Sequence, residues 1–258
     1  MQIHILASGS TGNAVFIEMG GHKILIDAGI STRRIEKGLA EVGIQVSQLD
    51  AILITHEHSD HIQGLDVLVR RYKVPVYTRP ATWGKIPCRD KLPRECCREL
   101  GSSLDLGSMK IEPFAISHDA ADPVGFCILQ GQIKTVLATD LGKVSQTVET
   151  ALAYADTVIL ESNHDPVMLK EGPYPAYLKK RISGPQGHLS NYEAGKILAR
   201  IPHAGTMQVF LAHLSQQNNF PHLAMHTVSE ILQQQGCNVG EEIMLKRTYP
   251  AATASWVD

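Results

Sequence analysis

Metal-ligand side chains are concentrated in one short segment of this chain, residues 56–61, which reads HEHSDH. Imidazole nitrogens and carboxylate oxygens are the ligands that zinc and similar divalent metals prefer. Three imidazoles in one turn repel one another once they are protonated, unless a metal holds them. The segment directly follows the apolar run 51–54, which is typical of a buried strand. The sequence therefore predicts a metal site at a strand end, with a coordination position left for water.

Further donors are spread along the chain, because a hydrolytic centre with two metals needs about seven or eight protein donors. Four expected strands end beside such a side chain: Asp27 after 23–26, His118 after 109–116, Asp140 after 134–138 and His213 after 207–211. Donors at several strand ends meet only if the strands lie in sheets whose ends are close together. The scaffold must therefore be rich in strands.

The elements that would position these donors follow from hydrophobic periodicity. Strands are expected at residues 2–8, 15–17, 23–26, 51–54, 74–77, 109–116, 125–129, 134–138, 157–160, 207–211 and 242–246. Helices are expected at residues 31–39, 65–72, 147–154, 191–200 and 221–235. Strands cluster in two blocks, each followed by helices, which favours an α/β fold with two packed sheets and outer helices, a four-layer αβ/βα sandwich. No repeat or linker is evident, so residues 1–258 are interpreted as a single domain.

Bulk composition narrows the class of protein. Hydrophobic residues make up 43% and charged residues 19% of the 258 residues, which predicts an ordinary folded chain. The formal net charge of −2 gives no whole-molecule attraction to nucleic acid, so a polyanion would have to bind a local basic surface or the metals. No signal peptide or membrane-spanning stretch is apparent, and five cysteines without a C-x-x-C motif indicate a cytoplasmic protein lacking disulfides. The oligomeric state is left open.

The pattern H-x-H-x-D-H at residues 56–61 resembles the signature of the metallo-β-lactamase superfamily, and the ordered donors downstream resemble its remaining motifs. The resemblance covers residues 1 to about 220 and implies the metallo-β-lactamase fold with two divalent metal ions, Zn, Mn or Fe. It implies these ligands: His56, His58 and His118 for the first metal, Asp60, His61 and His213 for the second, and Asp140 bridging both. Asp27 would orient a ligand histidine through a hydrogen bond.

The resemblance also implies a mechanism. Two metals about 3.5–4 Å apart lower the pKa of a bridging water, which gives a hydroxide nucleophile at neutral pH. Asp60 would be catalytic as both ligand and orienter of that hydroxide. The superfamily includes enzymes that hydrolyse β-lactams, thioesters and phosphodiesters, so the fold alone does not name the substrate.

Finer motifs resemble the YycJ/WalJ-type branch of the superfamily, whose members are described as 5′→3′ exonucleases acting on duplex DNA. The segments concerned are residues 8–13, 55–61, 161–165 (ESNHD), 187–191 (GHLSN), 212–215 (AHLS) and 218–221 (NNFP). This resemblance implies a phosphodiesterase with DNA or another phosphodiester as substrate. Asp140-Leu141-Gly142 departs from the expected Asp-Thr-Gly, at a neighbour of the ligand.

Two segments are candidates for substrate contact. The turn-forming loop that contains Ser8, Ser10 and Asn13 offers hydroxyls and backbone N–H groups to phosphate oxygens, although it also fits a plain β-turn. His188 precedes the helix that begins near Asn191, where an imidazole could contact phosphate or protonate the leaving oxygen. A hydrogen bond in the cap region is the alternative for His188. Asn191 is a further candidate for substrate binding.

Other polar groups are weaker candidates. His164 and Asp165 are interpreted as structural, and His222 and His226 as surface or core residues one helical turn apart. Basic side chains form three local groups: Arg70, Arg71 and Lys73; Lys85, Arg89, Lys91, Arg94 and Arg98; Lys179, Lys180 and Arg181. Each group is either a solvent-exposed face or part of a surface that binds successive phosphates of a nucleic acid.

Three functions remain open at this level. The first is a dinuclear nuclease of the YycJ/WalJ type, which the branch motifs favour. The second is a small-molecule phosphodiesterase or thioesterase on the same scaffold, with residues 79–103 closing a small pocket. The third is a non-enzymatic module that keeps the metals for folding or partner binding, which is disfavoured because structural metal sites normally close their coordination.

Overall fold

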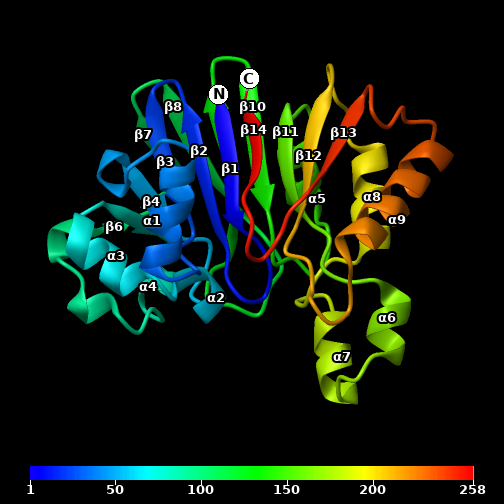
Figure 1. Cartoon of the computed structure of the whole chain (residues 1–258), viewed down its shortest axis with the longest axis horizontal. Helices are drawn as coiled ribbons and strands as arrows, with labels where there is room; N and C mark the ends of the chain where they lie inside the picture. Colours follow the sequence, from blue (N-terminus) through cyan, green and yellow to red (C-terminus); the bar gives the residue numbers. More distant parts are fainter. Residues whose placement is uncertain (258) are drawn as a thin grey trace. The chain divides into compact units, whose positions relative to one another are not determined.

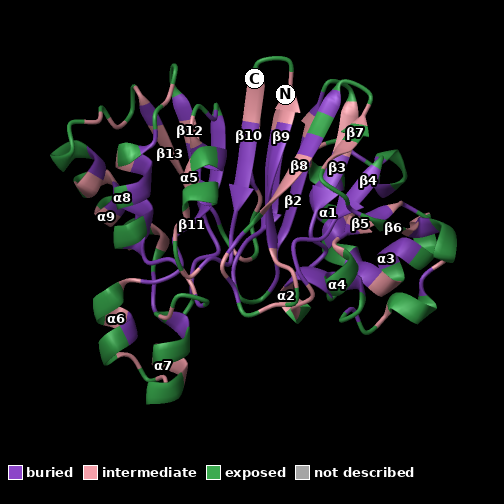
Figure 2. Ribbon diagram, turned by 180° about the vertical axis from the view of Figure 1, so that it is seen from behind, coloured by how far each residue is buried: buried purple, intermediate pink, exposed green. Residues whose placement is uncertain are grey.

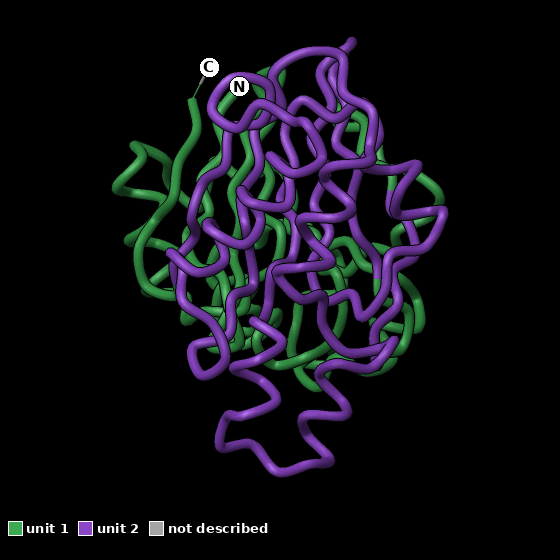
Figure 3. Tube along the Cα trace, turned by 90° about the vertical axis from the view of Figure 1, so that its right-hand side faces the viewer, with its two compact units in different colours: residues 1–112, 120–123, 250–258 green, residues 113–119, 124–249 purple. Residues whose placement is uncertain are grey.

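The computed structural model of the protein describes residues 1–257 and divides into two compact units (Figure 3). Unit 1 contains residues 1–112, 120–123 and 250 to the end of the described chain, and unit 2 contains residues 113–119 and 124–249. The described residues form two seven-stranded sheets, and helices accompany the strands of each unit (Figure 1).

The sheet of unit 1 has the strand order β14-β1-β2-β3-β4-β5-β6. Its strands are β1 (Gln2–Ala7), β2 (Ala14–Met19), β3 (His22–Ile26), β4 (Ala51–Leu53), β5 (Val76–Thr78), β6 (Cys97–Glu99) and β14 (Ala254–Val257). The first three strands form an antiparallel meander, and β3 to β6 run parallel. The β2–β3 hairpin turns at Gly20 and Gly21, and both glycines have the positive φ, 62° and 83°, that this turn requires.

Helices α1 (Thr32–Glu41) and α3 (Leu65–Tyr72) pack on this sheet through apolar faces. Ile35 and Leu39 of α1 are four residues apart, so they share one face and join the core around Phe16. The predicted start of α1 is confirmed, since the Ser31 side chain accepts a hydrogen bond from Arg34 N–H. Short helical turns also occur: η1 (Val46–Gln48), α2 (Ser59–Ile62), α4 (Pro80–Trp83), η2 (Arg89–Lys91) and η3 (Arg94–Cys96).

The second sheet has the order β13-β12-β11-β10-β9-β8-β7, and the boundary between the units passes through β8. Its strands are β7 (Leu104–Leu106), β8 (Met109–Ala115), β9 (Val124–Gln130), β10 (Ile133–Ala138), β11 (Thr157–Glu161), β12 (Met207–Ala212) and β13 (Ile243–Arg247). Strands β10 to β13 are parallel, and every residue of β11 is buried, as expected for a central strand covered on both faces. Figure 2 shows this burial along β10 to β12.

The core of unit 2 lies between these parallel strands and helices α5 (Gln146–Leu152), α8 (Asn191–Arg200) and α9 (Pro221–Gln234). Gly195 lets α8 approach α9 closely, because an added Cβ there would lie 2.9 Å from Ile231 Cδ1. Two further helices, α6 (Pro166–Glu171) and α7 (Ala176–Ile182), lie between β11 and α8 in the chain, beyond the carboxyl end of β11 (Figure 1).

Most predicted elements are confirmed, and the differences have local causes. The helix expected at 147–154 ends at Leu152, since Tyr154 adopts a positive φ of 57° and its N–H bonds to Pro202 O. The helices α6 and α7 were not expected, because each is too short to show a helical period. Among residues 1–257, no helix is long and apolar enough to cross a membrane.

Gly29 shapes the loop that carries the ligand segment. A Cβ on Gly29 would lie 1.7 Å from Asp60 O and 2.6 Å from Asn13 N. We expect Gly29→Ala to lower the free energy of unfolding by about 1–3 kcal/mol or more, because the backbone must move to relieve the overlap. Urea denaturation measures this change. Gly101→Ala is the matched control, since a Cβ there meets nothing within 4 Å. Equal stability of the two variants would contradict the proposed packing.

Candidate metal centre

The donor set of unit 1 begins where the parallel strands β3 and β4 end. Ile26 pairs with Leu53, so Asp27 and Thr55 leave the sheet side by side. Thr55 N–H and Oγ–H both donate to Asp27 Oδ1, at 2.9 and 3.1 Å. Asp27 has a φ of 62°, a conformation that costs free energy in a non-glycine residue. The strand ends thus hold this carboxylate in a fixed place.

Asp27 orients His61. Asp27 Oδ2 lies 2.7 Å from His61 Nδ1, and both side chains are almost fully buried. A carboxylate only accepts hydrogen bonds, so the proton of the neutral imidazole is on Nδ1 and the lone pair is on Nε2. Burial raises the pKa of Asp27 above its ordinary value, and His61 opposes that rise. His61 therefore presents the nitrogen that a metal would bind.

The remaining donors of this set have spacings that suit a shared cation. His56 Nε2 and His58 Nδ1 lie 3.1 Å apart, and His61 Nε2 lies 3.5 Å from Asp60 Oδ2. Two nitrogens bound to one tetrahedral zinc at 2.0–2.1 Å would be roughly 3.3 Å apart. His56 and His61 have no exposed surface, whereas Asp60 is partly exposed. The residues present therefore fit a divalent metal.

The Ser8–Asn13 loop closes on the ligand segment through Asn13. The Asn13 amide nitrogen contacts Asp60 O at 3.4 Å and His61 Nε2 at 3.2 Å, and its Oδ1 accepts from Gly9 N–H. Ser8 is buried and Ser10 is exposed. A cavity of about 560 Å³ in unit 1 is lined by Ser10 together with Asp60 and neighbouring residues. The loop is thus part of the wall beside the donors.

The donor set of unit 2 follows the carboxyl ends of three adjacent parallel strands. Asp140 comes after β10, Glu161 ends β11, and His213 comes after β12. Parallel strands bring such ends to one edge of the sheet, where ligands bind in open α/β sheets. Asp140 and His213 both have positive φ, 59° and 53°. His213 Nδ1 lies 3.4 Å from Asp140 Oδ1.

Glu161 organises this set. Its Oε1 lies 2.7 Å from His213 Nδ1 and 2.8 Å from His188 Nδ1, and its Oε2 accepts from the N–H groups of Leu141 and Leu189. Burial by itself would raise the pKa of Glu161, but His188 and His213 lower that pKa to about 2. The ionised carboxylate places both imidazole protons on Nδ1. The Nε2 atoms of both histidines therefore carry the lone pairs.

His118 and His188 are joined through the loop that precedes α8. Gly187 O accepts a hydrogen bond from His118 Nδ1 at 3.2 Å, and His188 N–H donates to Ile182 O. The rings of His118 and His188 are 5.2 Å apart, and His118 Nε2 lies 3.8 Å from Asp140 Oδ1. Burial lowers the pKa of His118 below its ordinary value, so the ring is neutral and can act as a ligand.

Each predicted metal ligand therefore lies in one of the two donor sets, and the roles assigned to these ligands stay predictions. Asn191 is fully buried, and its Oδ1 accepts from Ser162 Oγ at 2.6 Å and from Asn219 Nδ2 at 2.9 Å. Its predicted contact with substrate also stays a prediction. Glu161 was missed as a site residue, although an acidic residue that ends the apolar run TVIL was a usable signal.

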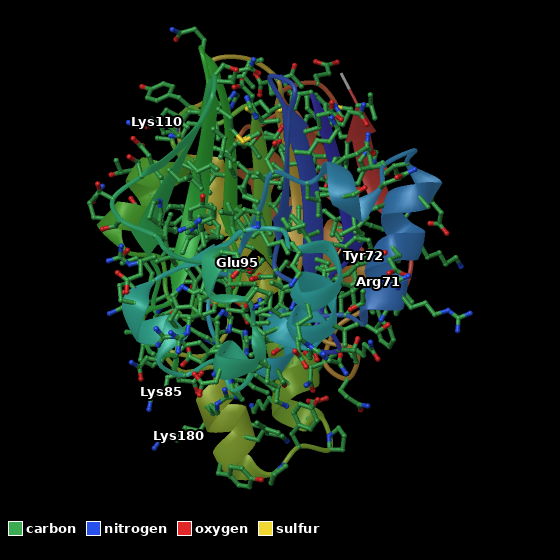
Figure 4. The ribbon with its side chains drawn as sticks, turned by 90° about the vertical axis from the view of Figure 1, so that its left-hand side faces the viewer. Arg71, Tyr72, Lys85, Glu95, Lys110 and Lys180 are labelled. Carbon is green, nitrogen blue, oxygen red and sulfur yellow. The ribbon has the colours of Figure 1, made fainter. Side chains whose placement is uncertain are left out.

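Several basic side chains of the predicted groups are paired with acids in the same unit. Arg71 and Tyr72 both donate to Glu36 Oε1, at 2.8 and 2.7 Å (Figure 4). Arg70 pairs with Asp66, which lies one turn earlier in α3. These pairs reduce the positive charge of the group around residue 70, so it attracts a polyanion less than its composition indicates.

Comparison with known proteins places the chain in a family. The model of the β-lactamase superfamily domain matches residues 22–239. An exodeoxyribonuclease YycJ of Bacillus anthracis is 37% identical over 97% of this chain and 96% of its own length. An exodeoxyribonuclease WalJ of Streptococcus pneumoniae is 38% identical over 95% of this chain and 93% of its own length.

The chain belongs to the β-lactamase superfamily, in its YycJ/WalJ branch. A crystal structure of the metallo-β-lactamase fold protein YhfI from Bacillus subtilis aligns with a TM-score of 0.70 at 17% identity, over 99% of each chain. The predicted fold class is confirmed by this likeness. As a member of this family, the protein is a metal-dependent hydrolase.

The role of Glu161 is testable. In Glu161→Gln the amide NH₂ would face N–H donors on at least one side, so a buried donor is left without an acceptor. We expect the free energy of unfolding to fall by about 1.5–3 kcal/mol and metal affinity to fall about 10–100-fold. Urea denaturation and elemental analysis after dialysis measure the two effects. Glu230→Gln, at an exposed pair with His226, is the control. Unchanged stability and metal content in Glu161→Gln would refute this role.

Proposed function

We propose that this protein is a dinuclear metal-dependent exodeoxyribonuclease that digests DNA from the 5′ end. The observation that carries the proposal is the 37–38% identity to two exodeoxyribonucleases over nearly the whole chain. The donor chemistry supports it, since each unit holds histidines whose protons are fixed by a buried carboxylate, Asp27 in unit 1 and Glu161 in unit 2.

The metal assignment is taken from the family pattern. His56, His58 and His118 would bind one ion, Asp60, His61 and His213 the other, and Asp140 would bridge them. The metal is Zn, Mn or Fe, because histidine–carboxylate sets accept each of these. When bound, the ions would acidify a water molecule and neutralise the phosphoryl oxygens.

The protein's own residues would handle protons and position the substrate. Glu161 accepts the Nδ1 proton of His188, so Nε2 of His188 is the atom that would take up a second proton from water and pass it to the leaving oxygen. Asp60, partly exposed, would orient the attacking water. Ser8, Ser10 and Asn191 are retained as proposed substrate contacts, and the hydrogen bonds of Asn13 give it a positioning role beside His61.

A small-molecule phosphodiesterase is the second candidate. The cavity of about 560 Å³ beside Asp60 is large enough for a mononucleotide, which supports this alternative; a thioesterase on the same scaffold stays open. Comparing turnover of duplex DNA, cyclic nucleotides and bis(p-nitrophenyl) phosphate separates the two activities. We further propose a cytoplasmic location, which the five free thiols of the described residues support.

Cleavage of DNA tests the main proposal. We expect the purified protein with Mn²⁺ to release nucleotides from a duplex progressively from its 5′ ends, as followed with 5′- and 3′-labelled strands. Asp60→Ala should lower kcat by at least about 100-fold, because a metal ligand and water-orienting group is lost. The absence of cleavage with Mn²⁺ or Zn²⁺, or full activity of Asp60→Ala, would sink the proposal. Lys37→Gln, at an exposed side chain of α1, is the control.

The acid role of His188 has its own signature. We expect His188→Gln to lower kcat for a DNA substrate by about 10²–10⁴-fold with little change in KM. A substrate with a p-nitrophenolate leaving group should lose much less, because that group departs without a proton. An equal loss for both substrates would show that His188 acts elsewhere than on the leaving oxygen.

A further inference from the structure

The helices α6 and α7 enclose a cavity of about 250 Å³ within unit 2. Its lining includes Lys170 from α6, Lys179 and Lys180 from α7, Ser183 after α7, and His164 before α6. None of the lining residues is acidic. The cavity is therefore strongly cationic, in a chain whose formal net charge is −2.

Two acidic groups near this cavity, Asp165 and Asp119, have other partners. The Asp165 side chain caps α6 by accepting from the N–H groups of Val167 and Met168. Asp119 binds Arg181 in a two-pronged pair, at 2.6 and 3.0 Å. Lys179 Nζ donates to Lys170 O at 2.7 Å, which fixes one ammonium at the cavity. The Lys180 side chain extends from α7 (Figure 4).

His164 supplies a second, independent observation. Its side chain is 3% exposed, and its Nδ1 is buried without a hydrogen-bond partner among residues 1–257. A buried polar atom without a partner costs about 1–3 kcal/mol, and native proteins rarely leave one without a reason. His164 also belongs to the wall of the cavity, so its ring suits a ligand that brings acceptor oxygens. The lysines favour a ligand that is anionic.

The backbone of His164 is rigidly held, so the ring is positioned by the fold. Its carbonyl accepts from Asn191 N–H at 2.9 Å, and its backbone forms a bridge with Ser190. Burial lowers the pKa of His164, so the ring is neutral and adds a hydrogen-bond donor, while the lysines add charge. This division of roles suits a phosphate group, which has several acceptor oxygens and a negative charge.

We propose that this cavity binds a phosphate group of the nucleic acid strand, at a subsite separate from the scissile bond. The inference rests on the proposed nuclease function and names a substrate contact for it. Tyr177, 76% exposed, is three residues before Lys180 on α7, so the two share a face. An exposed aromatic ring beside lysines is suited to a base next to a bound phosphate, which favours a strand over free phosphate.

The site is linked to the proposed acid through one short loop. Ser183 lines the cavity, and the same loop leads to Gly187 and His188, whose contacts with His118 and Glu161 are described above. A phosphate bound at Ser183 would therefore hold the strand beside the segment that positions His188. The consequence is tighter binding of strands long enough to reach the cavity.

A double variant that removes two lysine charges from the cavity tests the proposal. In the holoenzyme, binding of a 3′-fluorescein-labelled duplex with phosphorothioate linkages, which slow cleavage, is followed by anisotropy between 50 and 200 mM salt. We expect Lys170→Gln/Lys180→Gln to bind at least about fivefold more weakly and to reduce the salt slope by about one. Lys37→Gln/Lys110→Gln is the control for charge, and both of its lysines are largely exposed on unit 1. Cleavage of an unmodified duplex by the same double variants is compared with Mn²⁺ present, and the loss is expected in KM.

The outcomes separate this inference from the proposed function. A wild-type protein that cleaves no DNA removes the proposed function and this subsite with it. A wild-type protein that cleaves DNA, with Lys170→Gln/Lys180→Gln binding as tightly as the control, overturns the subsite alone.

A spectroscopic measurement identifies the phosphate source. In ¹⁵N-histidine-labelled protein, we expect the ring-nitrogen resonances of His164 to shift with a short DNA strand at micromolar concentration, and with inorganic phosphate or thymidine 5′-monophosphate only at millimolar concentration. The shift should weaken in Lys170→Gln/Lys180→Gln. Saturation by free phosphate or mononucleotide at lower concentration than the strand would overturn the nucleic-acid assignment, and no shift with any of these probes would overturn the site.

Discussion

Buried carboxylates that hold the Nδ1 protons of histidines are the interaction on which the candidate centre depends. Asp27 does this for His61 in unit 1, and Glu161 does it for His188 and His213 in unit 2. Without these acceptors each imidazole could place its proton on either nitrogen, and its orientation would be free. The same device in both units makes the Nε2 lone pairs available for metals or for proton transfer.

The parallel strands determine where the donor side chains lie. Asp27, Asp140 and His213 each follow the carboxyl end of such a strand, and all three adopt positive φ. A non-glycine residue in that conformation costs of order 1–3 kcal/mol, which the buried sheets can sustain. The chain therefore turns sharply at the sheet edge and directs short side chains into one region of each unit. Conformational strain at these positions is a consequence of donor placement.

Loop segments connect the donor side chains to other parts of each unit. Asn13 and Gly29 fasten the N-terminal loop to the ligand segment, and Gly187 joins His118 to the loop that carries His188. The α6–α7 segment adds a cavity lined by three lysines. The strand ends position the donor side chains. The short helices and loops, which would contact the substrate, can change without moving those donors.

The sequence alone determined the order of the longer elements, the fold class and the candidate ligands, because apolar periods and clustered donors are local signals in HEHSDH and at strand ends. It also singled out His188, from its place before α8. It did not identify Glu161 as the acceptor shared by His188 and His213, since that contact joins residues 27 and 52 positions apart. Nor did it indicate the cavity at His164, which needs two helices too short for a periodic signal. Tertiary structure decided both, because only folding brings such distant groups into hydrogen-bond range and removes water from them.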